Sequence, residues 1–167
     1  MTYNLISTQT IGAGGASSID FNSIPQTYTD LLLVVSMRTS GANVYEDGRI
    51  RINGSSANIY TERMLYGNGS VANTASTTNT QFNWSAVNGG TSTSNTFNNV
   101  QLYFSNYAGS TNKPMMNETV IENNGTSTMM MAHTGLWAST AAITSLSYYP
   151  SAGTVQQYST ASLYGIN

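Results

Sequence analysis

Short apolar segments, each closed by a turn signal, recur along the whole chain without a competing helical pattern. No long stretch repeats apolar residues with the 3.6-residue period of an amphipathic helix. The strand-like segments instead end at Gly, Pro or Asn-Gly about every 8–12 residues, as in antiparallel sandwiches and barrels. The predicted strands are Leu5–Ile11, Ser17–Ile24, Tyr28–Arg38, Gly48–Asn53, Asn58–Tyr66, Thr96–Tyr107, Met115–Asn123, Thr128–Trp137, Ile143–Tyr149 and Thr154–Ile166. We therefore expect an all-β protein, an antiparallel, jelly-roll-like β-sandwich of about ten strands with long polar loops.

The region from 70 to 95 departs from this pattern. It is rich in Thr, Ser, Asn and Gly, and it has few large apolar residues, among them Phe82, Trp84 and Val87. We expect long loops here around one short strand near Gln81–Ser85. The length of 167 residues is that of one domain, so we expect a single domain over residues 1–167.

Composition argues against an enzyme. Charged residues make up 7% of the chain, 64 of its 167 residues are Ser, Thr or Asn, there is no Cys, and His133 is the one histidine. General acid–base and nucleophilic catalysis need proton carriers and activated nucleophiles, which this chain almost lacks. We predict no catalytic residues and no cofactor. We expect His133 to be hydrogen-bonded within a strand.

Metal, nucleic-acid and membrane binding are also disfavoured. The best local carboxylate pair, Glu46-Asp47 before Gly48, lacks the spacing of a calcium loop, and Asp-Gly pairs form turns for conformational reasons. Five basic residues are too few for a nucleic-acid footprint. No apolar run approaches the ~18 residues of a membrane helix. We predict no metal site, no nucleic-acid partner and no membrane partner.

One group of interface candidates is a charged cluster. Seven of the twelve charged residues lie between positions 38 and 63. In adjacent strands they would form either a solvated edge of little energetic weight or an ion-pair network between subunits. The members of the cluster are Arg38, Glu46, Asp47, Arg49, Arg51, Glu62 and Arg63.

A second group comes from two strands that are apolar on both faces, Leu31–Met37 and Met129–Met131. A sheet of a free sandwich keeps one face wet, so the outer face of such a strand needs a cover, either a loop or another subunit. Met129 and Met131 are the further interface candidates.

Aromatic residues suggest a third kind of site. Tyr66, Phe82 and Trp84, flanked by neutral amides, would suit a platform for a glycan, although most aromatic residues of a sandwich belong to its core.

Several segments resemble a known class of proteins. They are Ile19–Val35, which reads IDFNSIPQTYTDLLLVV, Arg49–Gly54, which reads RIRING, Leu65–Gly69, which reads LYGNG, and the ending Ser162–Ile166. Together they resemble small structural proteins of tailed bacteriophages, especially phages of aquatic bacteria. The resemblance covers the first 70 residues and the C-terminal strand and implies a virion component. The resemblance does not say whether this component belongs to the head or the tail of the virion, and it identifies no site residues in this chain.

The resulting expectation is a non-enzymatic virion structural protein, a capsid decoration or cement protein that stabilises capsomer junctions. Its partners would be the major capsid protein or other virion proteins and further copies of itself, with a trimer preferred. It would assemble in the host cytoplasm and lie exposed on the particle. The alternative is a receptor- or glycan-binding head of a phage tail fibre, favoured by the aromatic residues within 70–95.

Overall fold

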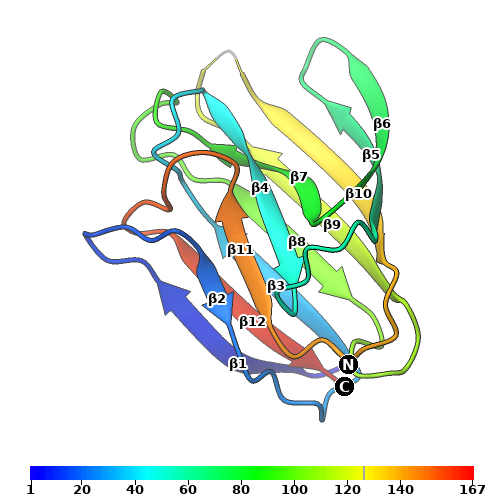
Figure 1. Cartoon of the computed structure of the whole chain (residues 1–167). Coiled ribbons are helices and arrows are strands. Elements are labelled where there is room, and N and C mark those ends of the chain that lie inside the picture. The colour runs from blue at the N-terminus through cyan, green and yellow to red at the C-terminus, as the bar shows by residue number, and fades with distance from the viewer. Residues whose placement is uncertain (126) are drawn as a thin grey trace.

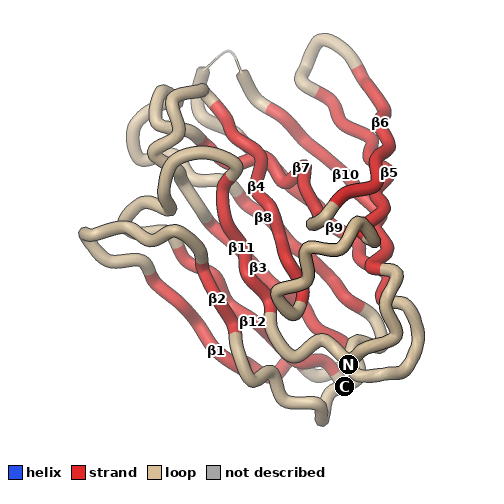
Figure 2. The backbone as a smooth tube through the Cα atoms, viewed as in Figure 1, coloured by secondary structure: helices blue, strands red, loops and turns tan. Residues whose placement is uncertain are grey.

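The chain folds into twelve antiparallel strands. The computed structural model describes residues 1–125 and 127–167, and no helix occurs in these two ranges (Figures 1 and 2). The strands are β1 (Tyr3–Thr10), β2 (Ile19–Phe21), β3 (Asp30–Ser36), β4 (Tyr45–Ile52), β5 (Tyr60–Gly67), β6 (Ala72–Asn79), β7 (Phe82–Asn88), β8 (Asn99–Phe104), β9 (Lys113–Ile121), β10 (Met129–Trp137), β11 (Leu146–Pro150) and β12 (Thr160–Ile166). The predicted all-β class is confirmed.

The strands form two sheets packed as a sandwich. The larger sheet has eight strands in the order β1-β12-β3-β8-β9-β10-β5-β6, and the smaller has four in the order β2-β11-β4-β7. Pairing joins β1 to β12, β2 to β11, β3 to β8 and β4 to β7, so the chain forms one long hairpin that folds back on itself. Rolling up such a hairpin places its strand pairs alternately in two facing sheets, which is the jelly-roll arrangement.

Two further hairpins are inserted into this jelly roll. The β5–β6 pair lies between β4 and β7 in sequence, and β9–β10 lies between β8 and β11. Both add to the same edge of the larger sheet, beyond β8. The larger sheet therefore extends well past the smaller one (Figure 1).

The core lies between the two sheets and follows the alternation of the strands. In β3, Leu31 and Leu33 point inward and are fully buried, whereas Leu32 and Val34 point outward and are half-buried. In β4, Ile50 is buried in the same core. Alternate side chains of a strand point to opposite faces, so one apolar series of β3 fills the sandwich and the other lies on its outside.

The polar region from 70 to 95 is more regular than we expected. It contains two complete strands, β6 and β7, in place of one short strand within loops, and the total is twelve strands instead of about ten. All eight residues of β6 are Ala, Asn, Ser or Thr, because β6 is the edge of the larger sheet and buries little on either face. A strand of this kind has no apolar alternation to reveal it.

The termini lie side by side at one end of the sandwich (Figure 1). The Thr2 amide donates to the Asn167 carbonyl oxygen at 2.8 Å, and the Asn167 amide donates to the Thr2 carbonyl oxygen at 3.2 Å. The β1–β12 ladder thus continues to the last residue of the chain.

Candidate functional site

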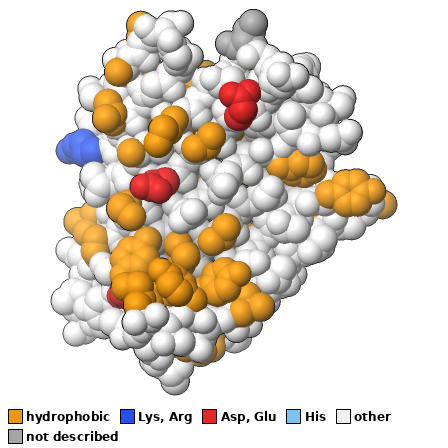
Figure 3. Space-filling model, turned by 180° about the vertical axis from the view of Figure 1, so that it is seen from behind, with side chains coloured by type: hydrophobic (Ala, Val, Ile, Leu, Met, Phe, Trp, Pro, Cys, Tyr) orange, Lys and Arg blue, Asp and Glu red, His pale blue; other side chains and the backbone are white. Residues whose placement is uncertain are grey.

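The outer face of the larger sheet carries an apolar surface with no covering layer. Strand register aligns one row of side chains across all eight strands: Leu5, Tyr164, Leu32, Tyr103, Met116, Thr134, Arg63 and Ser76. Figure 3, which views the molecule from behind, shows hydrophobic side chains gathered over this face. We call this the outer face.

Several large residues of the outer face are strongly exposed. Leu5 is 57% exposed, Met116 53%, Leu65 55% and Met130 66%. Apolar residues scattered singly over a surface are ordinary, but a continuous apolar area on one sheet marks a site of interaction. The outer face is therefore the strongest candidate for contact with another protein.

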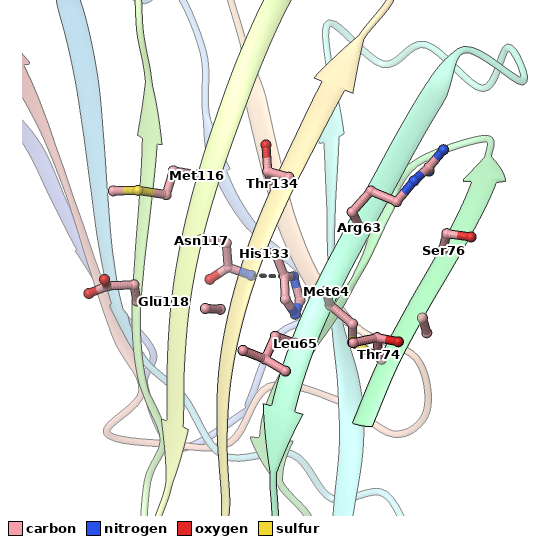
Figure 4. Close-up of a pocket in the computed structure, with 12 residues that line it drawn as sticks. Arg63, Met64, Leu65, Thr74, Ser76, Met116, Asn117, Glu118, His133 and Thr134 are labelled. Carbon is pink, nitrogen blue, oxygen red and sulfur yellow. Dashed lines mark hydrogen bonds between the residues drawn. The ribbon is translucent and has the colours of Figure 1, made fainter. Parts of the chain in front are cut away.

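A shallow groove of about 1000 Å³ crosses the outer face over β9, β10, β5 and β6. Ala132 lies in register between Glu118 of β9 and Leu65 of β5. Its side chain is small, so it forms the floor of the groove between these two larger side chains. Figure 4 shows Glu118 and Met116 on one side of this groove, with Leu65, Arg63 and the β6 residues on the other. The groove joins an apolar half of the outer face to a polar half.

Tyr103 is held in place at the apolar half. Its hydroxyl donates to Oδ2 of Asp30, and the Asn106 amide donates to Oδ1 of the same carboxylate at 2.7 Å. The hydrogen bond to Asp30 raises the pKa of Tyr103 to about 12, with burial adding to the effect. The ring is thus a neutral and oriented part of the outer face.

The charged cluster does not lie on one face. Arg38 is 9% exposed and its guanidinium lies inside the 90–96 loop, where it donates to the carbonyl oxygens of Thr93 at 2.8 Å and Ser92 at 3.0 Å. Glu46 is buried and accepts from the Asn43 side-chain amide at 2.8 Å. These two members support local loops inside the subunit, so our expectation of a shared network is corrected for them.

Glu62 is also internal. It is 1% exposed, and both of its carboxylate oxygens accept from the Asn83 amide at 3.0 Å. Burial, reinforced by the nearby Asp47 carboxylate, raises the pKa of Glu62 to about 8. Glu62 therefore belongs to the packing between β5 and β7, not to an exposed interface.

The remaining arginines are more accessible. Arg49 and Arg51 alternate with the buried Ile50 and Ile52 and lie half-buried on the outside of the smaller sheet. Arg51 donates to the Gln81 side-chain carbonyl at 2.9 Å, and its guanidinium lies 5.6 Å from the centre of the Tyr149 ring. Arg63 is exposed at the edge of the groove.

The methionines at positions 129–131 are oriented opposite to our prediction, which placed Met129 and Met131 at an interface. Met131 is 5% exposed and packs with Ile121 and the half-buried Met129 in a small second core, while Met130 projects from the outer face. The exposed member of the run is thus the one that the sequence did not single out. The apolar alternation was informative, but periodicity alone does not say which of the two series faces inward.

The three aromatic residues proposed for a glycan platform are divided. Phe82 is 1% exposed and meets the buried Tyr60 edge-to-face, with ring centres 5.0 Å apart, so it belongs to the main core. Tyr66 and Trp84 do share a cavity, which has a volume of about 190 Å³. The three-residue platform is therefore reduced to two.

His133 is buried on the inner side of β10, as a strand histidine. Its Nδ1 lies 3.1 Å from the Asn117 side-chain amide nitrogen, and its ring meets Trp84 edge-on at 6.4 Å (Figure 4 shows the contact with Asn117). Burial lowers the pKa of His133 to about 4. The ring is therefore neutral at physiological pH and accepts a hydrogen bond from Asn117.

Within residues 1–125 and 127–167, no group of three or more His, Asp or Glu side chains is placed to hold a metal ion. The same ranges contain no helix that is long and apolar enough to span a membrane. No protein-family model matches the chain, and a search of curated proteins finds no match. Function must therefore be argued from the surfaces themselves.

Proposed function

We propose that this chain is a non-enzymatic structural protein of a bacteriophage virion, a decoration or cement protein that binds the capsid surface and stabilises capsomer junctions. The observation that carries the proposal is the outer face, an apolar surface on the wider sheet without a layer to cover it. A subunit that is permanently docked keeps such a face dry, whereas a free subunit exposes it to water.

A docked interface would occupy a small part of this subunit. A standard interface buries ~800 Å² on each partner, which is roughly a tenth of the 7676 Å² accessible surface of this subunit. Low charge also fits an assembled protein, because net charge near zero promotes association. Jelly rolls serve as capsid domains and as lectins, so the fold agrees with the proposal by analogy only.

The partners in this proposal are the major capsid protein or a neighbouring virion protein, together with further copies of the chain in a homo-oligomer, for which we favour a trimer. The protein would assemble in the host cytoplasm and remain exposed on the particle. The alternative, a glycan- or receptor-binding head of a tail fibre, retains Tyr66 and Trp84 but loses Phe82 to the core.

The test is a triple variant of the outer face, Leu65→Thr, Met116→Thr and Met130→Thr, compared with the natural chain. The three residues are 53–66% exposed and Thr is a good strand former, so the fold should be unaffected. We expect the variant to sediment as a smaller species, and to lose binding to capsids, with an unchanged melting temperature.

The matched control changes apolar residues that are exposed elsewhere, Val44→Thr, Val71→Thr and Tyr158→Asn, with Asn at position 158 because the φ of 71° there disfavours a β-branched residue. This variant should assemble and bind like the natural chain. Equal loss in both triple variants, or retention of capsid binding by the outer-face variant, would overturn the proposal. Electron microscopy of particles labelled with the natural chain separates the alternatives, because copies on the tail alone would support the fibre head.

A further inference from the structure

A second cavity, separate from the outer face, lies at the β7 edge of the smaller sheet, against the inner side of the larger sheet where that sheet extends past β7. It has a volume of about 190 Å³ and is lined by three methionines, three aromatic residues and a single carboxylate. The aromatic residues are Tyr45, Tyr66 and Trp84, and the carboxylate is that of Asp47. The cavity thus receives side chains from β4, β5, β7 and β10.

Trp84 enters this cavity from a strained backbone. The β4–β7 register shifts between Gly48 and Ile50, so β7 bulges at this point, and Trp84 adopts a φ of 66°. A left-handed conformation at a bulky residue costs ~1–3 kcal/mol and persists only where the surroundings enforce it. The bulge turns the indole toward the second core, where His133 meets it edge-on. Such strain commonly accompanies a binding function.

Asp47 gives the cavity its charge. No hydrogen bond to its carboxylate oxygens is found among the residues that the structure describes, whereas its backbone N–H donates to the Ser151 hydroxyl oxygen at 3.0 Å. Burial raises the pKa of Asp47, Arg49 opposes this shift, and Glu46 adds to it. The Asp47 carboxylate in turn raises the pKa of Glu62. Asp47 is therefore the carboxylate that gives the cavity lining its negative charge, because Glu62 holds its proton at neutral pH.

Aromatic faces around a carboxylate are the arrangement that binds organic cations, because a ring face attracts positive charge and the carboxylate balances it. Methionine adds polarisable surface that adapts to alkyl groups. The volume is below the ~300–1000 Å³ of pockets for drug-sized ligands and suits a single headgroup. The lining has no side-chain amide, so a sugar would leave hydroxyl groups without partners, which costs affinity.

We propose that this cavity binds a quaternary ammonium group, which would lie against Tyr45, Tyr66 and Trp84 with Asp47 as its counter-ion. The inference does not depend on the virion role, because it uses a different surface. An organic ammonium group could come from a free compound such as choline or from a lysine side chain. The nitrogen of choline is fully alkylated, whereas that of lysine carries three protons. The methylated group fits better, since the lining is apolar apart from Asp47 and the tyrosine hydroxyls.

The experiment titrates the natural chain with choline and with 3,3-dimethylbutan-1-ol, a neutral compound of the same shape. Tryptophan fluorescence reports binding, because Trp84 lines the cavity while Trp137 is buried in the main core. We expect saturable binding of choline with a dissociation constant of about 1 mM or tighter, and at least ~10-fold weaker binding of the neutral compound. n-Butylammonium, which mimics a lysine side chain, should bind more weakly than tetramethylammonium.

Two pairs of variants test the residues. Asp47→Asn should weaken choline binding at least ~10-fold without changing the affinity for the neutral compound, whereas Asp20→Asn, at an exposed carboxylate of the same sheet, should change neither. Tyr66→Phe keeps the ring and should retain binding, whereas Tyr66→Leu should weaken it. Thermal melts confirm that each variant is folded. Equal affinity for both compounds, no saturable signal, or unchanged binding by Asp47→Asn would overturn the proposal, and stronger binding of n-butylammonium would assign the cavity to a lysine side chain.

Discussion

Arg38 shows how a charged residue that looks like a surface group can be part of the fold. Its two Nη atoms donate to the carbonyl oxygens of Gly90, Ser92 and Thr93, and its side chain is nearly inaccessible. A loop rich in small polar residues cannot bury enough apolar surface to hold its own shape. The guanidinium takes that role, because it offers five donors in a rigid arrangement.

Replacing Arg38 with Met should lower the free energy of unfolding by ~3 kcal/mol, because the buried loop carbonyl groups lose their donors while the apolar stem is kept. Arg63→Met, at an exposed position of β5, should change it by less than ~0.5 kcal/mol. Urea unfolding of both variants measures the difference. Equal effects of the two substitutions would mean that Arg38 is not a structural residue.

Glu62 and His133 should give the stability an unusual pH dependence. The folded-state pKa of Glu62 is about 8 against an ordinary 4.5, so as the pH rises through this window the unfolded chain releases the proton that the folded chain keeps, and the fold is destabilised. The pKa of His133 is about 4 against 6.5, so its effect has the opposite sign and ends above pH 6.5. Between pH 6.5 and 8, His133 therefore does not offset the loss of stability that Glu62 causes.

We predict that the natural chain loses about 2 kcal/mol of stability between pH 6.5 and 8, since one pKa unit corresponds to about 1.4 kcal/mol. Glu62→Gln should remove this loss, because the amide oxygen still accepts from Asn83 and carries no proton to release. Glu122→Gln, at an exposed residue, should keep the loss. Urea titrations at the two pH values measure it, and a natural chain equally stable at both would contradict the assignment to Glu62.

Among the strands, β6 and β10 mark what the sequence could and could not predict. The alternation of β10 and its neighbours gave the strand positions, because buried side chains must recur every second residue. β6 was missed because an edge strand of Thr, Ser and Asn carries no such pattern. The inward direction of Met131 was missed because it depends on the hairpin insertions, which no local pattern specifies.

Gly135 of β10 should not tolerate a side chain. A Cβ atom there would lie 2.6 Å from Cε1 of Phe82 and 2.9 Å from Cε of Met115, both in the main core. We expect Gly135→Ala to cost ~1–3 kcal/mol by overpacking, and to lower the melting temperature by several degrees. Gly67→Ala is the matched control, because its nearest atom is 3.9 Å away. Calorimetry compares the two, and similar melting temperatures would show that Phe82 can move aside.

For the assembled fold, the jelly-roll class could be predicted but the candidate surfaces could not. Strand count and spacing follow from local patterns, whereas the outer face depends on the order in which strands pair. Leu5 and Arg63 belong to one row of side chains although 58 positions separate them in the chain. The cavity around Trp84 was anticipated only through Tyr66 and Trp84 as possible glycan contacts, because Asp47 was expected in a charged cluster, either a solvated edge or an ion-pair network between subunits.

The paired termini predict that the order of the segments can be changed. Joining Asn167 to Met1 with a short Gly linker and opening the chain at Gly69, in the exposed β5–β6 turn, should give a cooperatively folded protein. Opening between Leu102 and Tyr103, within a central strand, should not. Circular dichroism and thermal melts test both, and an unfolded Gly69 permutant would show that the β5–β6 connection is essential.

The same pairing of distant segments has a consequence for folding speed. β1 can form its ladder only with β12, at the other end of the chain, so much of the larger sheet must wait for a long loop to close. Among the described strands, only β5–β6, β8–β9 and β9–β10 pair strands that follow one another in the chain. Proteins dominated by non-local pairing refold in about milliseconds to seconds. Newly made chains therefore remain exposed to one another for longer than those of a helical protein of this size, with the apolar residues of the outer face open to contact throughout.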